Sequence, residues 1–335
     1  MAITAKELAK ELGLSQAAVS MALNNKPGVS TATRRQVIEG AQRLGYDFSR
    51  KAVARGSWKG QFCLVVYRRS GAVVGDTPFF ADLTNGVSVG CKKAQYDLLI
   101  RYLYEDETLP EQLYTLEASG FRGIILLATE MDAPSLSRFS QMKMPLVILD
   151  AYFETADYNY VLINNIQGAF LATQYLISKR RAQPGYLCSS YQISNFAERA
   201  DGFYKAIRKN GMSTAKSPVH QLTPSQEGAY ADMKALLESG EEPADCYFAD
   251  NDHIAIGAIA ALKEAGYRIP EDVAVVGFDD LPLCNYMDPP LTTVHVPIQL
   301  MGETAVGRLA EMVEKKDCHA MKIEISAVLI KRKSV

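Results

Sequence analysis

The N-terminal stretch TAKELAKELGLSQAAVSMALN, residues 4–24, places its apolar side chains with the period of an α-helix. In the first half they recur at i, i+3, i+4 and i+7 and form one stripe: Ala5, Leu8, Ala9 and Leu12. Gly13 then offers the backbone conformations that a sharp turn requires. The inner face of the second half is again apolar: Val19, Ala22 and Leu23. The pattern predicts two short amphipathic helices, N-capped by Thr4 and Ser15.

The outer face of the second helix is small, polar and free of charge: Gln16, Ala17, Ser20, Met21 and Asn24. A helix with such a face, supported by a small scaffold, can lie in the major groove of DNA. An ordinary helical hairpin at a domain terminus would have the same spacing. The pattern alone leaves both interpretations open.

A third helix is predicted over residues 31–44, with Ser30 as its N-cap. Its apolar face consists of Val37, Ile38, Ala41 and Leu44. Three helices this close together in the chain can share one small core. A basic linker, residues 47–60, follows. Its AVAR segment is too short to be a stable helix in isolation and could form one against DNA or a second copy of itself.

From Gln61 onward, apolar runs of strand length alternate with helical segments, which predicts βαβ units and parallel sheets covered on both faces. The first half has strands at 62–67, 96–104, 123–128 and 145–150 and helices at 78–95, 110–120 and 134–142. The second half has strands at 161–164, 184–190, 218–222, 246–250 and 273–280 and helices at 168–179, 198–211, 226–240 and 253–266. A segment at 292–296, a helix at 299–315 and one strand at 322–331 follow. The predicted fold class is α/β with an all-α head, and a ligand cleft is expected where the strands of the two halves end.

Composition and charge separate the head from the remainder of the chain. The 335 residues are 48% hydrophobic and 22% charged, as in a soluble globular protein. Residues 1–60 carry ten Lys/Arg and four Asp/Glu, whereas the remaining residues carry 26 and 34. A basic head on an acidic body suggests that the head alone meets a polyanion, although chance clustering of solvated charges would give the same asymmetry.

Targeting signals and metal motifs are lacking in the sequence. No apolar run approaches the roughly 20 residues of a membrane span, and no secretory signal is visible. The six cysteines are scattered without a CxxC pair, and the four histidines are dispersed. We therefore expect a cytoplasmic protein without metal, cofactor or membrane partner.

Several motifs together resemble the LacI/GalR family of transcription regulators over essentially the whole chain. They are AKELAKELGLSQAAVSMALN, VSTATRRQVIEGAQRLGY, PFFADLTNGV, ERADGF, FADNDHIAIGAIAALKEAGYRIPEDVAVVGFDD and PPLTTVHVPIQLMGETA. The resemblance implies a helix-turn-helix head (1–46), a hinge (47–60) and a two-lobed, periplasmic-binding-protein-like body (61–335). Lobe 1 would comprise about 61–160 and 294–320, and lobe 2 about 161–293 and 321–335. It also implies a homodimer that binds a pseudo-palindromic operator in double-stranded DNA.

The resemblance assigns DNA contacts to positions of the head. Gln16, Ala17 and Met21 match base-reading positions, and a second set matches phosphate-binding positions: Thr4, Ser15, Ser20, Asn24, Ser30 and Thr33. Met21 departs from the arginine of many members, which can contact guanine through two hydrogen bonds. Methionine offers an apolar surface for a thymine methyl, so an altered operator preference is expected.

The hinge departs from the family pattern as well. Family hinges usually carry a leucine that wedges into the minor groove, whereas Arg55 stands at the ungapped position here. A gapped alignment would instead place Ser57 there. Arg55 in a narrow minor groove is a reasonable substitute.

In the body, the resemblance assigns effector contacts to Asp150, Arg199, Asn251 and Asp279. Carboxylates, guanidinium and amide groups suit a polyhydroxylated ligand, and Phe79 and Phe80 could stack on a sugar ring. Two alternatives stay open: Asp279 could be a simple turn residue, and Arg199 could pair with Glu198 or Asp201 on its own helix.

The predicted function is a DNA-binding repressor controlled by a small ligand, expected to be a mono- or oligosaccharide. A purine or another metabolite could also be the effector, because aspartate and arginine hold purines too. A solute-binding protein would share the two-lobed body but would not need the basic head. An enzyme is not predicted, because the sequence contains neither a GxxxxGK[ST] phosphate loop nor a nucleophile elbow.

Overall fold

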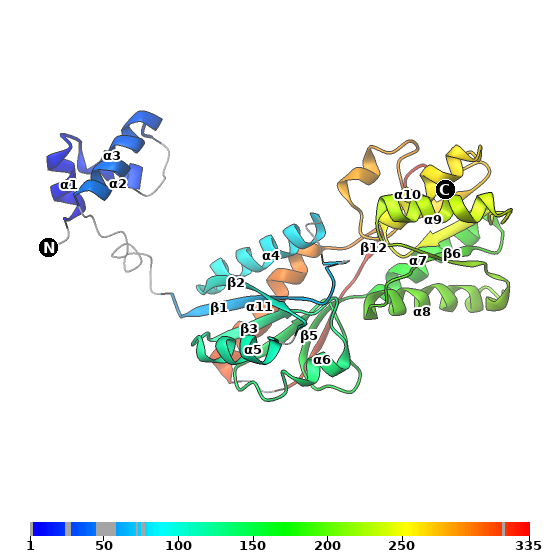
Figure 1. Cartoon of the computed structure of the whole chain (residues 1–335), viewed down its shortest axis with the longest axis horizontal. Coiled ribbons are helices and arrows are strands. Elements are labelled where there is room, and N and C mark those ends of the chain that lie inside the picture. The colour runs from blue at the N-terminus through cyan, green and yellow to red at the C-terminus, as the bar shows by residue number, and fades with distance from the viewer. Residues whose placement is uncertain are drawn as a thin grey trace. The chain divides into compact units, whose positions relative to one another are not determined.

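The computed structural model describes residues 3–23, 28–44, 58–71, 73–74, 78–106, 108–316 and 319–335, without the side chains of Thr31 and Gln42. The chain divides into a head, residues 1–59, and a body, residues 60–335 (Figure 1). The described cysteines are free thiols: Cys63, Cys91, Cys188, Cys246 and Cys284. Within the described ranges, no helix is long and apolar enough to cross a bilayer.

The head contains three helices around one small core. They are α1 (Ala5–Glu11), α2 (Gln16–Leu23) and α3 (Thr31–Arg43). Leu8, Val19 and Val37, one from each helix, are fully buried against one another. Gly13 has a φ of 64°, a left-handed conformation that favours glycine, and makes the turn between α1 and α2. The predicted helix-turn-helix head is confirmed.

Lobe 1 of the body is a parallel six-stranded sheet between two helical layers. Its strand order is β11-β5-β4-β3-β1-β2. The strands are β1 (Gln61–Arg68), β2 (Asp97–Tyr104), β3 (Gly123–Leu127), β4 (Leu146–Leu149), β5 (Asn159–Ile163) and β11 (Lys322–Ile325). One face is covered by α4 (Pro78–Ala94) and α11 (Ile298–Lys315), and the other by α5 (Leu109–Ala118) and α6 (Ala133–Ser137) (Figure 1). Both faces are apolar because alternate residues of β1 pack on opposite layers.

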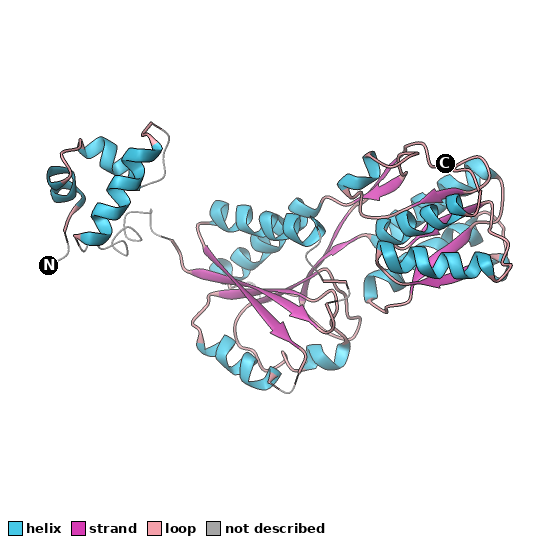
Figure 2. Ribbon diagram, turned by 45° about the horizontal axis from the view of Figure 1, so that its top comes forward, coloured by secondary structure: helices cyan, strands magenta, loops and turns pink. Residues whose placement is uncertain are grey.

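Lobe 2 repeats this architecture with a parallel four-stranded sheet of order β7-β6-β8-β9 (Figure 2). Its strands are β6 (Gly185–Ser189), β7 (Val219–Leu222), β8 (Cys246–Ala249) and β9 (Ala274–Val276). Its helices are α7 (Asn165–Arg180) and α8 (Ser194–Lys209) on one face, and α9 (Gln226–Glu238) and α10 (Asp252–Glu264) on the other. Two short 3-10 helices, η2 (Thr214–Lys216) and η3 (Pro282–Asn285), lie in connections.

The C-terminal prediction of one strand over 322–331 is wrong. The run is split into β11 and β12 (Val328–Ile330), which belong to different sheets. β11 pairs in parallel with β5 in lobe 1, and β12 pairs antiparallel with β10 (Thr293–His295). The predicted lobe boundaries at 161 and 321 are therefore displaced, since β5 and β11 belong to lobe 1. The apolar run does not mark where the chain crosses between the lobes.

The predicted helix over 134–142 is also shorter than expected and ends at Ser137. The hydroxyl of Ser137 donates to the carbonyl of Pro134, and that of Ser140 donates to the carbonyl of Ser137, both at 2.6 Å. Such local side-chain bonds compete with continuation of the helix.

Helices α4 and α11 approach each other at two glycines. A Cβ on Gly86 would lie 2.4 Å from the backbone oxygen of Gln299, and one on Gly302 would lie 2.5 Å from the backbone nitrogen of Val87. Any side chain at either position would collide with the backbone of the partner helix. The two glycines therefore set the spacing of this helix layer.

Candidate functional site

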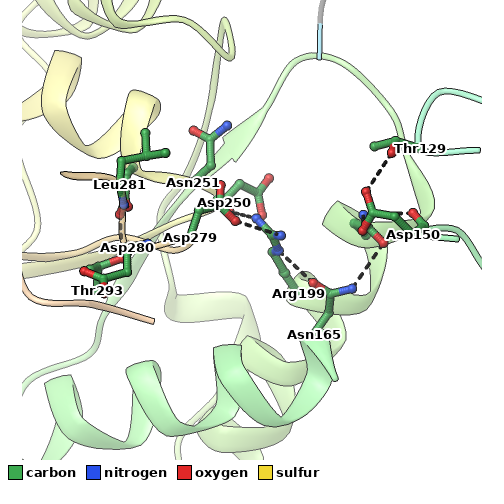
Figure 3. Close-up of polar contacts among 12 residues, drawn as sticks. Thr129, Asp150, Asn165, Arg199, Asp250, Asn251, Asp279, Asp280, Leu281 and Thr293 are labelled. Carbon is green, nitrogen blue, oxygen red and sulfur yellow. Dashed lines mark hydrogen bonds and ion pairs between the residues drawn. The ribbon is translucent and has the colours of Figure 1, made fainter. Parts of the chain in front are cut away.

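Asp150 follows β4 and lies buried where the two lobes meet. Its φ of 64° is a turn conformation that aspartate tolerates better than most residues. Thr129 Oγ1 donates to Asp150 Oδ2 at 2.6 Å (Figure 3). Asn195 Nδ2 of lobe 2 donates to Asp150 Oδ1 at 3.0 Å. Burial raises the pKa of Asp150 to about 6, although these hydrogen bonds and Arg199 oppose the shift. Asp150 is thus an inter-lobe acceptor.

Arg199, on α8, is 3% exposed and is held on all three of its nitrogens. Nε donates to Asn165 Oδ1 at 2.9 Å, Nη1 donates to the carbonyl of Asp250, and Nη2 pairs with Asp279 Oδ1 at 3.2 Å (Figure 3). The guanidinium carbon lies 3.7 Å from the ring centroid of Phe278, a cation–π geometry. This ion pair joins α8 to the segment after β9, so the alternative of pairing on its own helix is not what the structure has.

Asp279 and Asp280 occupy one turn but have different partners. Their φ values are 108° and 58°. Asp280 accepts from Arg332 Nη2 at 2.7 Å and faces His295 Nδ1 at 3.0 Å. Burial raises the pKa of Asp279 to about 6, against the opposing effect of Arg199. Asp280 therefore ties the turn to neighbouring strands, whereas Asp279 faces Arg199.

Two further buried carboxylates, Asp250 and Asp252, form hydrogen bonds around these groups, and the sequence analysis did not single them out. Asp250 accepts from the hydroxyl of Tyr186 and from the backbone NH of Ser189 at 2.7 Å. Asp252 accepts from the hydroxyl of Thr293 and from the backbone NH of Leu281. Burial raises the pKa of both carboxyls to about 7, and the charge of Asp279 adds to the shift of Asp252. Their place in FADNDH, on either side of Asn251, was the available signal.

Asn251 is the N-cap of α10. Its Oδ1 accepts from the backbone NH of Ile254 at 2.9 Å. Because the carboxamide oxygen of Asn251 caps the helix, its NH2 group is the part that can donate a hydrogen bond to a ligand.

A cavity of about 360 Å³ lies over these groups. All six residues predicted to contact a ligand line it: Phe79, Phe80, Asp150, Arg199, Asn251 and Asp279. The two phenylalanine rings are T-shaped, with centroids 5.1 Å apart. The lining also includes polar residues that sequence reasoning missed: Thr129, Asn195, Ser225, Gln226, Glu227 and His253. The volume and the few convergent polar groups are typical of a small-molecule site.

Three further aromatic side chains differ in position. Phe196, on α8, lines the cavity. Tyr152 packs edge-to-face against Tyr160, with ring centroids 5.1 Å apart. The hydroxyl of Tyr191 accepts from Ser70 at 3.0 Å, a second contact between the lobes.

Glu130, three residues after the end of β3, organises the loop that follows β1. Its Oε2 accepts the backbone NH groups of Arg69, Ser70 and Gly71, and its Oε1 accepts those of Val73 and Val74, all at 2.8–3.0 Å. Burial alone would raise the pKa of Glu130, but these hydrogen bonds hold it below its ordinary value. Val73 lines the cavity. One carboxylate therefore shapes part of the cavity wall.

The predicted DNA-contacting residues of the head differ in exposure. Gln16, Ala17 and Ser20 are exposed on α2, whereas Met21 is half-buried. The sulfur of Met21 would lie 3.1 Å from a Cβ at Gly28, so the loop before α3 covers part of this side chain.

The hydroxyl residues of the head cap its helices. Thr4 Oγ1 accepts from the NH of Glu7 at 3.3 Å, Ser15 Oγ from that of Ala18 at 3.1 Å, and Ser30 Oγ from that of Thr33 at 3.1 Å. Thr33 Oγ1 lies 2.8 Å from Ser30 Oγ. The predicted contacts at Asn24 and Arg55 lie outside the described residues.

A metal site has no support in the described part of the chain, where no group of three or more His, Cys, Asp or Glu residues could hold an ion.

Comparisons with known proteins cover the whole chain. The periplasmic binding protein-like domain family matches residues 173–335. The chain is 30% identical over 338 residues to the HTH-type transcriptional repressor PurR of Mannheimia succiniciproducens, which covers 99% of this chain and 98% of that protein. It is 32% identical over 306 residues to the HTH-type transcriptional regulator GalS of Salmonella typhimurium, with 90% and 88% covered.

Solved structures of transcription regulators also align with nearly the whole chain. The transcriptional regulator CelR–cellobiose complex aligns with a TM-score of 0.74 at 25% identity, covering 99% of this chain and 100% of that one. The Lac repressor dimer bound to operator and the anti-inducer ONPF aligns with a TM-score of 0.73 at 21% identity, covering 100% and 99%. The latter likeness concerns the fold.

Proposed function

Because the chain belongs to the LacI/GalR family of transcriptional regulators, which are not enzymes, we propose that it is a repressor whose operator affinity is set by a ligand in the body cavity. Full-length similarity to helix-turn-helix repressors favours this function over a two-lobed solute-binding protein. Its proposed partner is DNA, so we expect it to act in the cytoplasm.

DNA binding by the head is supported by charge and by the surface of α2. Ten Lys/Arg against four Asp/Glu in residues 1–60 suit the phosphate backbone. Gln16 and Ser20 offer donors and acceptors to base edges and phosphates from the exposed face of α2.

We expect a homodimer on a pseudo-palindromic operator, because two-fold proteins read two-fold sites. Exposed apolar side chains on the body suit such an association: Tyr286 is 84% exposed and Leu283 is 43% exposed, both at η3 or directly after it. Sedimentation at micromolar concentration tests this, and a monomer that still binds a two-fold operator with full affinity would contradict it.

One observation carries the effector proposal: a buried Arg199–Asp279 pair and the acceptor Asp150 converge on one cavity with two phenylalanines. Carboxylates accept from hydroxyls, the guanidinium donates, and an aromatic ring stacks on the apolar face of a sugar. A sugar is therefore our leading effector class.

A purine is the second candidate, because an aromatic ring near Arg and Asp side chains can also stack on a planar base and relatives include PurR.

Ligand control requires that the two lobes close around the effector and that closure changes how the head meets DNA. The contact of Asn195 with Asp150 joins the lobes at the cavity, and that of Ser70 with Tyr191 joins them elsewhere. To switch DNA occupancy decisively, the effector must distinguish the two states by several kcal/mol.

The test is a mobility-shift titration of the full chain on an operator obtained by selection from random duplex DNA. A sugar panel and hypoxanthine are added to the preformed complex, and ligand binding is measured separately by thermal shift. We expect one ligand both to stabilise the protein and to change DNA occupancy. A ligand that binds the body but leaves DNA binding unchanged would contradict the allosteric proposal, and absence of any selected operator would contradict DNA recognition.

A further inference from the structure

The described walls of the cavity carry more acid than base. Asp150, Asp279 and Glu227 supply carboxyl groups, whereas Arg199 is the one Lys or Arg among the described lining residues. Its three nitrogens already bond Asn165, Asp250 and Asp279. The cavity therefore offers no cation whose charge is left for an anionic ligand.

The buried surroundings do not offset this imbalance. Asp250 and Asp252, on either side of Asn251, are buried carboxyl groups and add no positive charge. Burial lowers the pKa of His253, which disfavours the charged form of this lining side chain. A phosphate or carboxylate ligand would meet like charge without a free partner.

A second polar cluster lines the same cavity at the N-terminal ends of α9 and α10: Ser225, Gln226, Glu227 and His253. Gln226 Nε2 lies 3.2 Å from His253 Nδ1. With this amide nitrogen as the donor, Nδ1 is assigned as the acceptor, and Nε2 of His253 then carries the proton. The histidine thus presents a neutral donor.

Glu227 complements that donor with an acceptor. It is exposed in the first turn of α9, and it has no ion pair among the described residues. The cluster therefore combines one NH donor with one carboxylate acceptor, which suits a hydroxyl group that both accepts and donates. Its elements differ from those that carry Asp150, Arg199 and Asp279.

We infer that the ligand is an uncharged glycoside of more than one ring, held at Asp150, Arg199 and Asp279 by one ring and at Glu227 and His253 by the next. The inference rests on the proposed function, whose sugar site it extends. Both polar clusters line the same cavity of about 360 Å³, a volume in the range of small-molecule sites. Sugar phosphates and uronic acids are excluded by the charge of the walls.

The test measures the affinity of the full chain for matched probes by calorimetry after a thermal-shift screen. The probes are glucose, cellobiose and glucose 6-phosphate; xylose and xylobiose; and galactose, lactose and galacturonate. At least one disaccharide should bind about tenfold or more tightly than its monosaccharide, because a second set of hydrogen bonds is made. The phosphate and the uronate should not bind.

Variants then locate the second ring. Glu227→Gln and His253→Ala should each lower the disaccharide affinity by about tenfold and leave the monosaccharide affinity within about twofold, because a bond to a charged or buried group is lost. Glu238→Gln, at the exposed end of the same helix, is the matched control and should change neither affinity.

Three results would overturn the inference: a monosaccharide that binds as tightly as its disaccharide, tightest binding by a charged probe, or no binding by any disaccharide. Equal losses of mono- and disaccharide affinity in Glu227→Gln would also count against it. Operator binding without ligand is measured in parallel, so failure of the regulator proposal is seen separately from failure of the glycoside proposal.

Discussion

Replacement of Glu130 by glutamine isolates the role of one carboxylate in shaping the cavity wall. Glutamine keeps the volume but has a single acceptor oxygen. If this oxygen stays with the NH groups of Arg69, Ser70 and Gly71, the new NH2 group faces the NH groups of Val73 and Val74. Val74 is 1% exposed, so its NH cannot turn to water.

The magnitude follows from these two donors. A buried donor that loses its partner costs about 1–3 kcal/mol, and the remaining bonds lose their charge assistance. We therefore expect Glu130→Gln to lower the free energy of unfolding of the body by about 2–4 kcal/mol. Because Val73 lines the cavity, ligand affinity should fall as well.

The assay is urea unfolding followed by circular dichroism, with Glu105→Gln as the control. Glu105 bonds Arg69, which is 38% exposed and also pairs with Asp132. Glu105 is 22% exposed and also accepts from the hydroxyl of Ser135 at 2.6 Å, a bond that the remaining oxygen of glutamine can still accept. Loss of the ion pair with Arg69 should therefore cost less than about 1 kcal/mol. A Glu130→Gln protein as stable as Glu105→Gln would refute the reasoning, because the five NH groups would then have found other partners.

Three further predictions concern packing, pH and DNA. Gly86→Ala should destabilise the body by about 1–3 kcal/mol in thermal or urea unfolding, because the new Cβ would collide with the backbone of Gln299. Gly307→Ala is the control in the same helix layer: a Cβ there has no neighbouring atom within 4 Å, so this change should stabilise the body by up to about 1 kcal/mol. Equal effects of the two substitutions would contradict the close approach of the helices. The pKa values of Asp150 and Asp279 are raised to about 6, so their contribution to folding stability is fully present below the unfolded value of 3.8 and is lost as the pH rises through about 6. The affinity for the sugar should instead fall as the pH drops below 6, because protonated carboxyl groups accept hydrogen bonds from the ligand less well. Calorimetry between pH 5 and 8 measures this. An affinity that does not change with pH would mean that Asp150 and Asp279 do not contact the ligand. Met21→Arg should change the preferred bases of the selected operator without abolishing DNA binding, because arginine can form two hydrogen bonds with guanine. An unchanged base preference would mean that the half-buried side chain at position 21 does not contact bases.

The sequence was most informative where a side chain acts at the end of a regular element. Asp150 follows an apolar strand of lobe 1 and Asp279 follows one of lobe 2, and ligands bind at the carboxyl ends of parallel strands in such sheets, so their convergence on the cavity between the lobes was predictable. That a ligand binds there stays a prediction. The helical period likewise predicted the buried face of each helix in the head.

Other roles depended on contacts that no local pattern encodes. Glu130 bonds residues 56 to 61 positions away, and its partners are backbone NH groups, which every residue but proline has. Arg199 could equally have paired within its helix, and only the fold brings Asp279, 80 residues away, to 3.2 Å. The crossing between β11 and β12 was hidden because only Ser326 and Ala327 separate the two strands, and neither glycine nor proline marks the break.

The return of the chain to lobe 1 after lobe 2 has a consequence for synthesis on the ribosome. Residues 298–325 supply α11 and the edge strand β11, and α11 contributes Met301, Val306 and Leu309 to the core over β1. Lobe 2 can acquire its sheet and four helices while the face of lobe 1 that α11 covers is still partly exposed. During translation lobe 1 therefore stays an incomplete intermediate with exposed apolar surface until residues 298–325 emerge, and such intermediates are prone to aggregate.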